Sequence, residues 1–195
     1  MKKWIVIAAL VLGVLLMYSY VKNLYNKMVT MDEGATAQWS QVENVYQRRM
    51  DLIPNLVNTV KGYANFEKET LTQVIEARSK ATSVNINADN LNPETLQKFQ
   101  AAQDGLSQAL SKLMVVVEKY PELKANENFM DLQKQLEGTE NRITVERRKF
   151  NETIQAYNTY IKRFPNNVMA GMFNFEKKAY FQATEGAEKA PEVKF

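Results

Sequence analysis

The chain has 195 residues, 45% of them hydrophobic and 24% charged, which suits one folded domain with an additional segment. Seven glycines and five prolines are few for this length and favour long helices over a β-fold with many tight turns. The net charge of +3, from 25 basic and 22 acidic residues, is too balanced for a nucleic-acid surface. The sequence has no Cys and no His, which excludes disulfides, thiolate chemistry and histidine-based catalysis or metal binding. We therefore expect no cofactor, no metal and no nucleic-acid partner.

Residues 4–21 form an uncharged apolar run that is flanked by Lys3 and Lys22. As an α-helix the run spans roughly 27 Å, close to the ~30 Å hydrocarbon core of a bilayer. Trp4 and Tyr20 stand at its two ends, as aromatic residues do in membrane-spanning helices. The alternative is a cleaved signal peptide, but the run does not end in a small-x-small cleavage pattern. We expect a retained single-pass anchor.

The side of the membrane is harder to predict, because lysines lie on both sides of the apolar run. We expect the protein in the cell (inner) membrane with its body on the outer face, as for anchors that also act as export signals. The expected domains are an anchor with a juxtamembrane helix at residues 1–30, a helical bundle at 31–164, and a docking segment with a polar tail at 165–195.

The first body helix is expected from Trp39 onward, because apolar residues recur there at alternating spacings of three and four. Arg49 falls on this apolar stripe. Pro54 also lies within it, where it removes a backbone donor and crowds the carbonyl of Met50, so we expect a bend. The stripe comprises Trp39, Val42, Tyr46, Ile53, Leu56, Val60 and Tyr63.

Three further helices are predicted by caps and periodicity. One begins at Asn65 as N-cap and ends near Lys80, followed by a loop over residues 81–91. The next begins with Asn92 as N-cap and Pro93 as first helical residue, and it ends before Pro121. The last covers residues 127–164 and ends at Pro165. The fold class is therefore all-α, an elongated antiparallel bundle of three to four long helices with an N-terminal transmembrane helix.

Each long apolar stripe has a polar interruption. These are Arg49 in the first helix, Gln103 in the third, and a segment of the last helix that includes Glu140 and Glu146. In aligned hairpins the three would form one layer, with Arg49 paired to Glu140 or Glu146, and this layer would set register more than stability. In the alternative, Arg49 follows its aliphatic stem out to water.

Several of these segments resemble the LemA family of bacterial membrane proteins. The most specific stretch is RRMDLIPNLV at residues 48–57, followed by VKGYA at 60–64. Ala77-Arg78, Tyr157-Asn158 and the FPNN run from Phe164 complete the likeness, which reaches Phe181. The resemblance implies an amino-terminal membrane helix, a helical body and no assigned molecular activity.

The chain departs from the family pattern at one place. Many members carry His-Glu where this chain has Phe66-Glu67, so no metal or proton role of that histidine carries over. The family is also described with its short amino end outside the cell, opposite to the orientation expected above. Sidedness therefore stays open at the level of sequence.

The segment around Pro54 has the most unusual local chemistry, with two guanidiniums and a carboxylate within a turn of an internal proline. It is either a binding corner for a partner or, as we favour, an intrachain network that stabilises a bent helix. The residues concerned are Arg48, Arg49, Asp51, Pro54 and Asn55.

The segment after the last helix carries much apolar surface for its length. It has three alternatives: it docks onto the end of the bundle, inserts into a membrane interface, or forms a contact between subunits. The residues that define it are Phe164, Pro165, Asn166, Phe173 and Phe175, with Val168, Met169, Met172, Tyr180 and Phe181.

No pattern in the sequence indicates catalysis. Ser79-Lys80 and Ser111-Lys112 are adjacent pairs, which diverge by about 100° on a helix and do not face each other. The sequence therefore predicts a non-enzymatic scaffold that self-assembles and binds the bilayer and other membrane or envelope proteins. The alternative is a signalling or regulatory subunit in which the anchor helix continues into the bundle.

Overall fold

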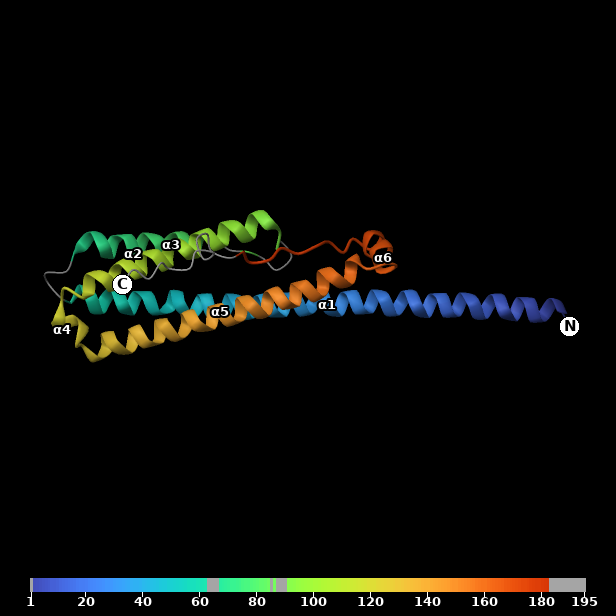
Figure 1. Ribbon diagram of the computed structural model, residues 1–195, viewed down its shortest axis with the longest axis horizontal. Helices are drawn as coiled ribbons and strands as arrows, with labels where there is room; N and C mark the ends of the chain where they lie inside the picture. The colour runs from blue at the N-terminus through green and yellow to red at the C-terminus, as the bar shows by residue number, and fades with distance from the viewer. Residues whose placement is uncertain (1, 63–66, 85, 87–90, 183–195) are drawn as a thin grey trace, which may run out of the picture. The chain divides into compact units, whose positions relative to one another are not determined.

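The computed structural model describes residues 2–62, 67–84, 86 and 91–182 (Figure 1), and in these residues all regular secondary structure is helical. The predicted all-α class is confirmed. The helices are α1 (Lys2–Lys61), α2 (Lys68–Ser83), α3 (Pro93–Val117), α4 (Pro121–Lys124), α5 (Glu127–Lys162) and α6 (Asn166–Met172).

The chain divides into two compact units. Unit 1 contains Met1–Val45 and Ile143–Lys178, and unit 2 contains Tyr46–Arg142 and Ala179–Phe195. Helices α1 and α5 each contribute one part to both units. The predicted domains at residues 1–30, 31–164 and 165–195 were defined by their expected function, not by packing, and they stay a prediction.

Helix α1 is one uninterrupted helix, although the body helix was expected to begin near Trp39. Residues 22–38 contain no proline and only Gly34 as a poor helix former, so nothing in them ends the helix. The first part of α1 is the one described helix that is long and apolar enough to cross a membrane, with a mean hydropathy of 2.3 over its most apolar window. Every residue from Lys2 to Tyr20 is exposed, and packing begins at Val21.

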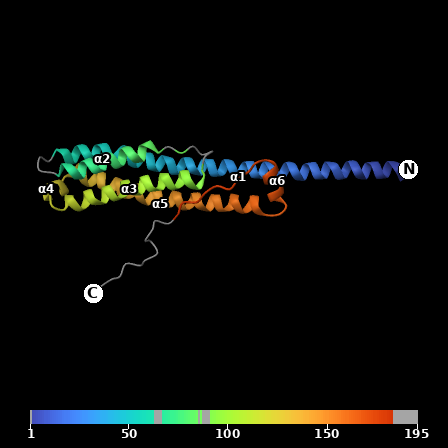
Figure 2. The ribbon, with the colours of Figure 1, turned by 90° about the horizontal axis from the view of Figure 1, so that it is seen from above.

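Unit 1 is built on the contact between α1 and α5, seen side by side in Figures 1 and 2. The Trp39 and Phe150 rings meet edge to face with centroids 5.5 Å apart. A second cluster joins Met28, Tyr157 and Ile161 to Ala170 of α6. The expected stripe of α1 therefore extends toward the amino terminus and reaches the residues that follow the apolar run.

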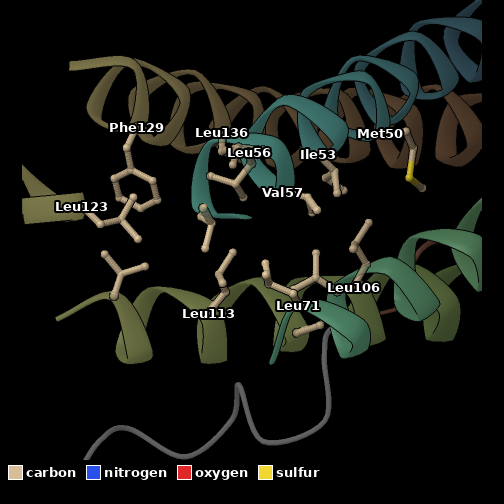
Figure 3. Close-up of a cluster of buried hydrophobic side chains, with 14 of the residues drawn as sticks. Met50, Ile53, Leu56, Val57, Leu71, Leu106, Leu113, Leu123, Phe129 and Leu136 are labelled. Atoms are coloured by element: carbon tan, nitrogen blue, oxygen red, sulfur yellow. The ribbon is translucent and has the colours of Figure 1, made fainter. Parts of the chain in front are cut away.

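Unit 2 is a bundle formed by the end of α1, helices α2 to α4 and the beginning of α5. Figure 3 shows its apolar core, to which all five segments contribute. The heptad positions of the end of α1 lie inside it, except Tyr63, which is outside the described residues. Core side chains from the five segments include Ile53, Leu56, Leu71, Leu106, Leu113, Leu123, Phe129 and Leu136.

Asparagine side chains cap the starts of two helices, of which only the one at Asn92 was predicted. The Oδ1 of Asn92 accepts the backbone N–H of Thr95 at 2.9 Å at the start of α3, as expected. The Oδ1 of Asn126 accepts the N–H of Phe129 at 3.0 Å at the start of α5. Helix α2 begins at Lys68 and runs to Ser83, into the expected loop, and the predicted cap Asn65 lies outside the described residues.

Two prolines begin helices where they were expected only to end them. Pro121 is the first residue of α4, and Pro165 is the N-cap of α6. Proline is well suited to the first turn of a helix, because its missing N–H would have no intrahelical partner there. Helix α3 ends at Val117, before Pro121 as predicted, and α5 ends at Lys162, two residues before the predicted end at Phe164.

Candidate functional site: a buried arginine layer and a clamped C-terminal segment

Arg49 is buried in unit 2 with only 2% of its surface exposed, so it does not reach water. Its Nη1 donates to Glu140 Oε2 and to Ser107 Oγ, both at 2.9 Å. Its Nη2 donates to Gln103 Oε1 at 2.5 Å. Of the two predicted acidic partners the structure selects Glu140, and Gln103 joins the same layer.

The guanidinium of Arg49 also lies on an aromatic surface. Its Cζ is 5.1 Å from the centre of the Tyr46 ring, one turn earlier on α1. Tyr46 in turn packs edge to face on Phe99 of α3 at 4.9 Å. Glu140 is half-exposed, whereas the Arg49 guanidinium is buried. The buried positive charge is therefore neutralised by a carboxylate that lies at the surface of the bundle.

The other polar residues of the predicted segment do not join this layer. Arg48, Asp51 and Asn55 are exposed, and Asp51 accepts only a hydrogen bond of 2.8 Å from Gln47 on its own helix. The 3.6-residue period places Arg48 and Arg49 on different faces of α1. In the structure, therefore, the Arg49 guanidinium points into the bundle, whereas Arg48, Asp51 and Asn55 lie on its exposed surface.

Pro54 leaves the carbonyl of Met50 without its helical donor, as its missing N–H requires. Arg78 of α2 supplies the replacement, because its Nε donates to the Met50 carbonyl oxygen at 3.1 Å. Arg78 was not among the residues of the network predicted around Pro54, and that network stays a prediction. The contact explains the polar Arg78 on a helix that packs into an apolar core.

A cavity of about 260 Å³ lies beside Arg49 in unit 2. Its walls are mixed, with Ser111, Gln133 and Glu137 among the polar residues and Met114 among the apolar ones. Both η nitrogens of Arg49 are already bonded to protein groups, so the cavity offers no free charge from the arginine. No cluster of acidic residues suited to a metal ion is found among the described residues.

Asn158 holds the C-terminal segment of unit 1 in place, a contact that was not predicted, although Asn158 belongs to the family resemblance. The Nδ2 of Asn158 donates to the Lys178 carbonyl at 2.9 Å, and its Oδ1 accepts the Lys178 N–H at 3.0 Å. The Tyr157 hydroxyl donates to the Glu176 carbonyl at 2.9 Å. The Lys178 ammonium pairs with Asp32 of α1 at 2.9 Å. These contacts fix the segment against both helices of the unit.

The end of α6 turns the chain so that two aromatic rings reach α1. Asn174 has a φ of 60°, a conformation that asparagine tolerates better than most residues, and the N–H of Phe175 bonds to the Ala170 carbonyl at 2.9 Å. Phe173 and Phe175 then both pack edge to face on Tyr25, at 4.9 and 5.8 Å.

The remaining residues of the predicted C-terminal site have different environments. Asn166 is buried, and its Nδ2 donates to the Tyr160 carbonyl at 3.0 Å. Pro165 is half-buried, whereas Phe164 is 84% exposed. The structure thus shows the docking alternative for part of the segment and leaves part of its apolar surface uncovered.

Tyr157 and Glu146 are among the titratable groups of unit 1 whose pKa values are shifted. Burial, followed by the charge of Asp32, raises the pKa of the Tyr157 hydroxyl, which therefore stays protonated. Hydrogen bonds from Lys149 and from Gln38, the latter at 2.8 Å, lower the pKa of Glu146. Glu146 is thus a carboxylate that joins α1 to α5, and not the partner of Arg49.

The structure defines a class of protein: a helical bundle that carries an exposed, apolar amino-terminal helix long enough to cross a membrane. The chain belongs to the LemA family, whose family model matches residues 38–195. The match begins one residue before Trp39 and covers the segments on which the sequence resemblance was based.

Named relatives extend the comparison. Two magnetosome proteins of Paramagnetospirillum magneticum (strain AMB-1), MamQ 1 and MamQ 2, are each 28% identical over 199 residues, which covers 90% of this chain and 72% of theirs. The magnetosome protein MamQ of Magnetospirillum gryphiswaldense is 28% identical over 88% of this chain and 71% of its own. The protein LemA of Metamycoplasma hominis is 29% identical over 75% of this chain and 63% of its own.

Proposed function

We propose that this protein is a membrane-anchored helical scaffold that self-assembles and presents its bundle to other membrane or envelope proteins, without catalytic activity. The observation that carries the proposal is the change of environment along α1. Residues 2–20 are exposed and largely apolar, and the same helix becomes packed from Val21 onward. Such an apolar surface is stable in lipid and unfavourable in water.

The chemistry of the buried groups supports a structural role. Arg49, Arg78 and Asn158, three polar residues that reach into the packed parts, each bind groups of this chain. Each contact holds one helix or segment against another, and none aims a reactive group at a cavity. The names of the similar proteins give no enzymatic activity.

A second candidate function is a signalling or regulatory subunit, which the continuity of α1 favours. In unit 1 the apolar stretch and the packed stretch belong to one helix with no break between Lys22 and Val45. A displacement of the anchor would therefore move the packed part as well. Inserts of equal length beside Lys27 distinguish the two functions. A scaffold should tolerate both a flexible glycine insert and a helical alanine insert. A signalling subunit should lose its function with the glycine insert and keep it with the alanine insert.

Mass in detergent tests the scaffold proposal directly. The full-length protein is purified in mild detergent, and its mass is measured by light scattering together with the identity of co-purifying proteins. We expect an assembly of several copies or a complex with membrane proteins. A lone monomer without companions would contradict the proposal.

The orientation of the body is tested separately. The sequence has no Cys, so a single cysteine at an exposed position of unit 2, such as Lys112→Cys, is a unique label. We propose that the body lies on the outer face of the inner membrane. A membrane-impermeant maleimide should then label this variant in cells whose envelope outside the inner membrane is permeabilised while the inner membrane is intact. Labelling only after lysis of the inner membrane would place the body inside.

A further inference from the structure

Helix α6 lies beside α1 near the start of the exposed apolar part of α1 (Figure 2), and α6 carries exposed apolar side chains. Val168 and Met172 are four residues apart on α6 and share its outer side, with exposures of 53% and 71%. Phe164 precedes them in the turn before α6. The opposite side of α6 is covered, since Asn166 and Ala170 are buried in the unit. We call Phe164, Val168 and Met172 the outer face of α6.

The position of α6 along α1 fixes its distance from the apolar run. Phe173, directly after α6, packs on Tyr25 with ring centroids 4.9 Å apart. Tyr25 follows Val21, the end of the apolar run, by four residues, which is about 6 Å along a helix. The polar layer on each side of a bilayer core is roughly 5–8 Å thick. When α1 spans the bilayer, α6 is therefore at the depth of the headgroups.

The charges around this surface suit such a position. Lys22 and Lys27 of α1, Lys162 and Arg163 at the end of α5, and Lys177 are all exposed. The neighbouring Lys162 side chain disfavours the charged form of Lys177 and lowers its pKa, so these two side chains lie close together. Asp32 is paired with Lys178. An apolar helix face bordered by basic residues is the pattern of helices that lie in a membrane interface next to anionic lipids.

A second copy of the chain is a poorer occupant for the same surface. A specific protein interface uses about 20–30 residues on each side, and this face offers three apolar side chains with one half-covered aromatic beside them. Lipid requires no such area, because insertion depends only on the apolar surface removed from water. The exposed Phe164 at 84% is best accounted for by a surrounding that is itself apolar.

We propose that the outer face of α6 inserts into the interface of the same bilayer that α1 crosses, so that the protein contacts lipid at a second site. The inference rests on the proposed membrane anchoring. Through Phe173, Phe175 and Ala170 this second site is attached to the packed part of unit 1 and restrains that unit against the membrane surface.

Depth-dependent fluorescence quenching tests the proposal on the full chain. Four single-cysteine variants are prepared, each with a polarity-sensitive fluorophore: Leu10→Cys within the apolar run, Val168→Cys and Met172→Cys on α6, and Arg148→Cys on α5. All four native side chains are exposed, so the fold is retained. The Arg148 position lies fifteen residues before Arg163, about 22 Å along the helix, and is the control in water. The proteins are reconstituted in vesicles of phosphatidylcholine and phosphatidylglycerol that carry spin-labelled lipids.

We expect loss of fluorescence from Leu10→Cys with acyl-chain spin labels, and from Val168→Cys and Met172→Cys with headgroup-level labels, while Arg148→Cys is unaffected. Quenching at Leu10 with none at the two α6 positions would overturn the inference and leave the anchor intact. The inference would also be overturned if the unlabelled Met172→Cys variant, in the same vesicles under oxidising conditions, formed a disulfide with a second copy. Absence of quenching at Leu10 would refute the anchoring itself and, with it, the inference.

Discussion

The Arg49–Glu140 pair gives a sharp test of how unit 2 is held together. The Arg49 side chain is 3% exposed and that of Glu140 54% exposed, so the two charges contribute unequally to the cost of burial. The Glu140→Ala substitution leaves a buried cation with only the neutral acceptors Ser107 and Gln103. Breaking a fully buried pair costs about 3–5 kcal/mol, and a charged hydrogen bond contributes about 1.5–3 kcal/mol.

Because water can reach half of Glu140, we expect a cost at the lower end, about 2 kcal/mol in the free energy of unfolding. The same Glu140→Ala change should cost less than about 0.5 kcal/mol in an Arg49→Met background, where no buried cation is left unpaired. Glu137→Ala is the matched control, an exposed glutamate three residues earlier on α5 that should change stability by less than about 0.5 kcal/mol.

The assay is urea unfolding of the full-length variants in mild detergent, followed by far-ultraviolet circular dichroism. A positive coupling of about 1–2 kcal/mol in the double-mutant cycle would agree with a sequestered, compensated arginine. If Glu140→Ala costs the same in both backgrounds, the two charges do not interact, and Arg49 is satisfied in another way.

Three further results are expected. Arg78→Met should lower the free energy of unfolding by about 1–2 kcal/mol, and much less in a Pro54→Ala background, where the new backbone N–H can bond the carbonyl that Arg78 serves; equal losses would contradict this. Asn158→Ala should expose the bond after Lys178 to trypsin much faster than in the unchanged protein, whereas unaltered cleavage would show that Asn158 does not hold the segment. Since the pKa of Glu146 is lowered by folding, its contribution to stability should be present above its ordinary value of 4.5 and lost as pH falls through the lower folded pKa; Glu146→Gln should flatten this part of the pH–stability curve, and an unchanged curve would argue against it.

Much of the architecture was readable from local patterns. The apolar spacing of α1 and α5 identified their buried faces, and Asn92 with Pro93 identified the start of α3. In α2 the apolar Ile75 is exposed, while Thr70 and Ala81 are buried. Small and polar residues carry little periodic signal, so their burial depends on neighbours that the sequence does not reveal.

The contacts that join distant segments were predicted only where a polar residue interrupted an apolar stripe. Arg49 and Gln103 are such interruptions, and the number of possible acidic partners on the last helix was small. Lys178 lies among other polar residues with no periodic pattern, and Asn158 was marked only by the family resemblance, so the contact between them was not predicted. The continuity of α1 was predicted only in the signalling alternative, because the end of an apolar run marks a change from lipid to water and does not by itself end a helix.

The intact mass of the protein recovered from alkaline-washed cell membranes tests the central claim, that α1 crosses the bilayer as a retained helix and is packed only from Val21 onward. We expect the protein in the membrane pellet with a mass that includes the apolar residues 4–21. Recovery in the soluble fraction, or a mass that lacks this segment, would contradict the claim.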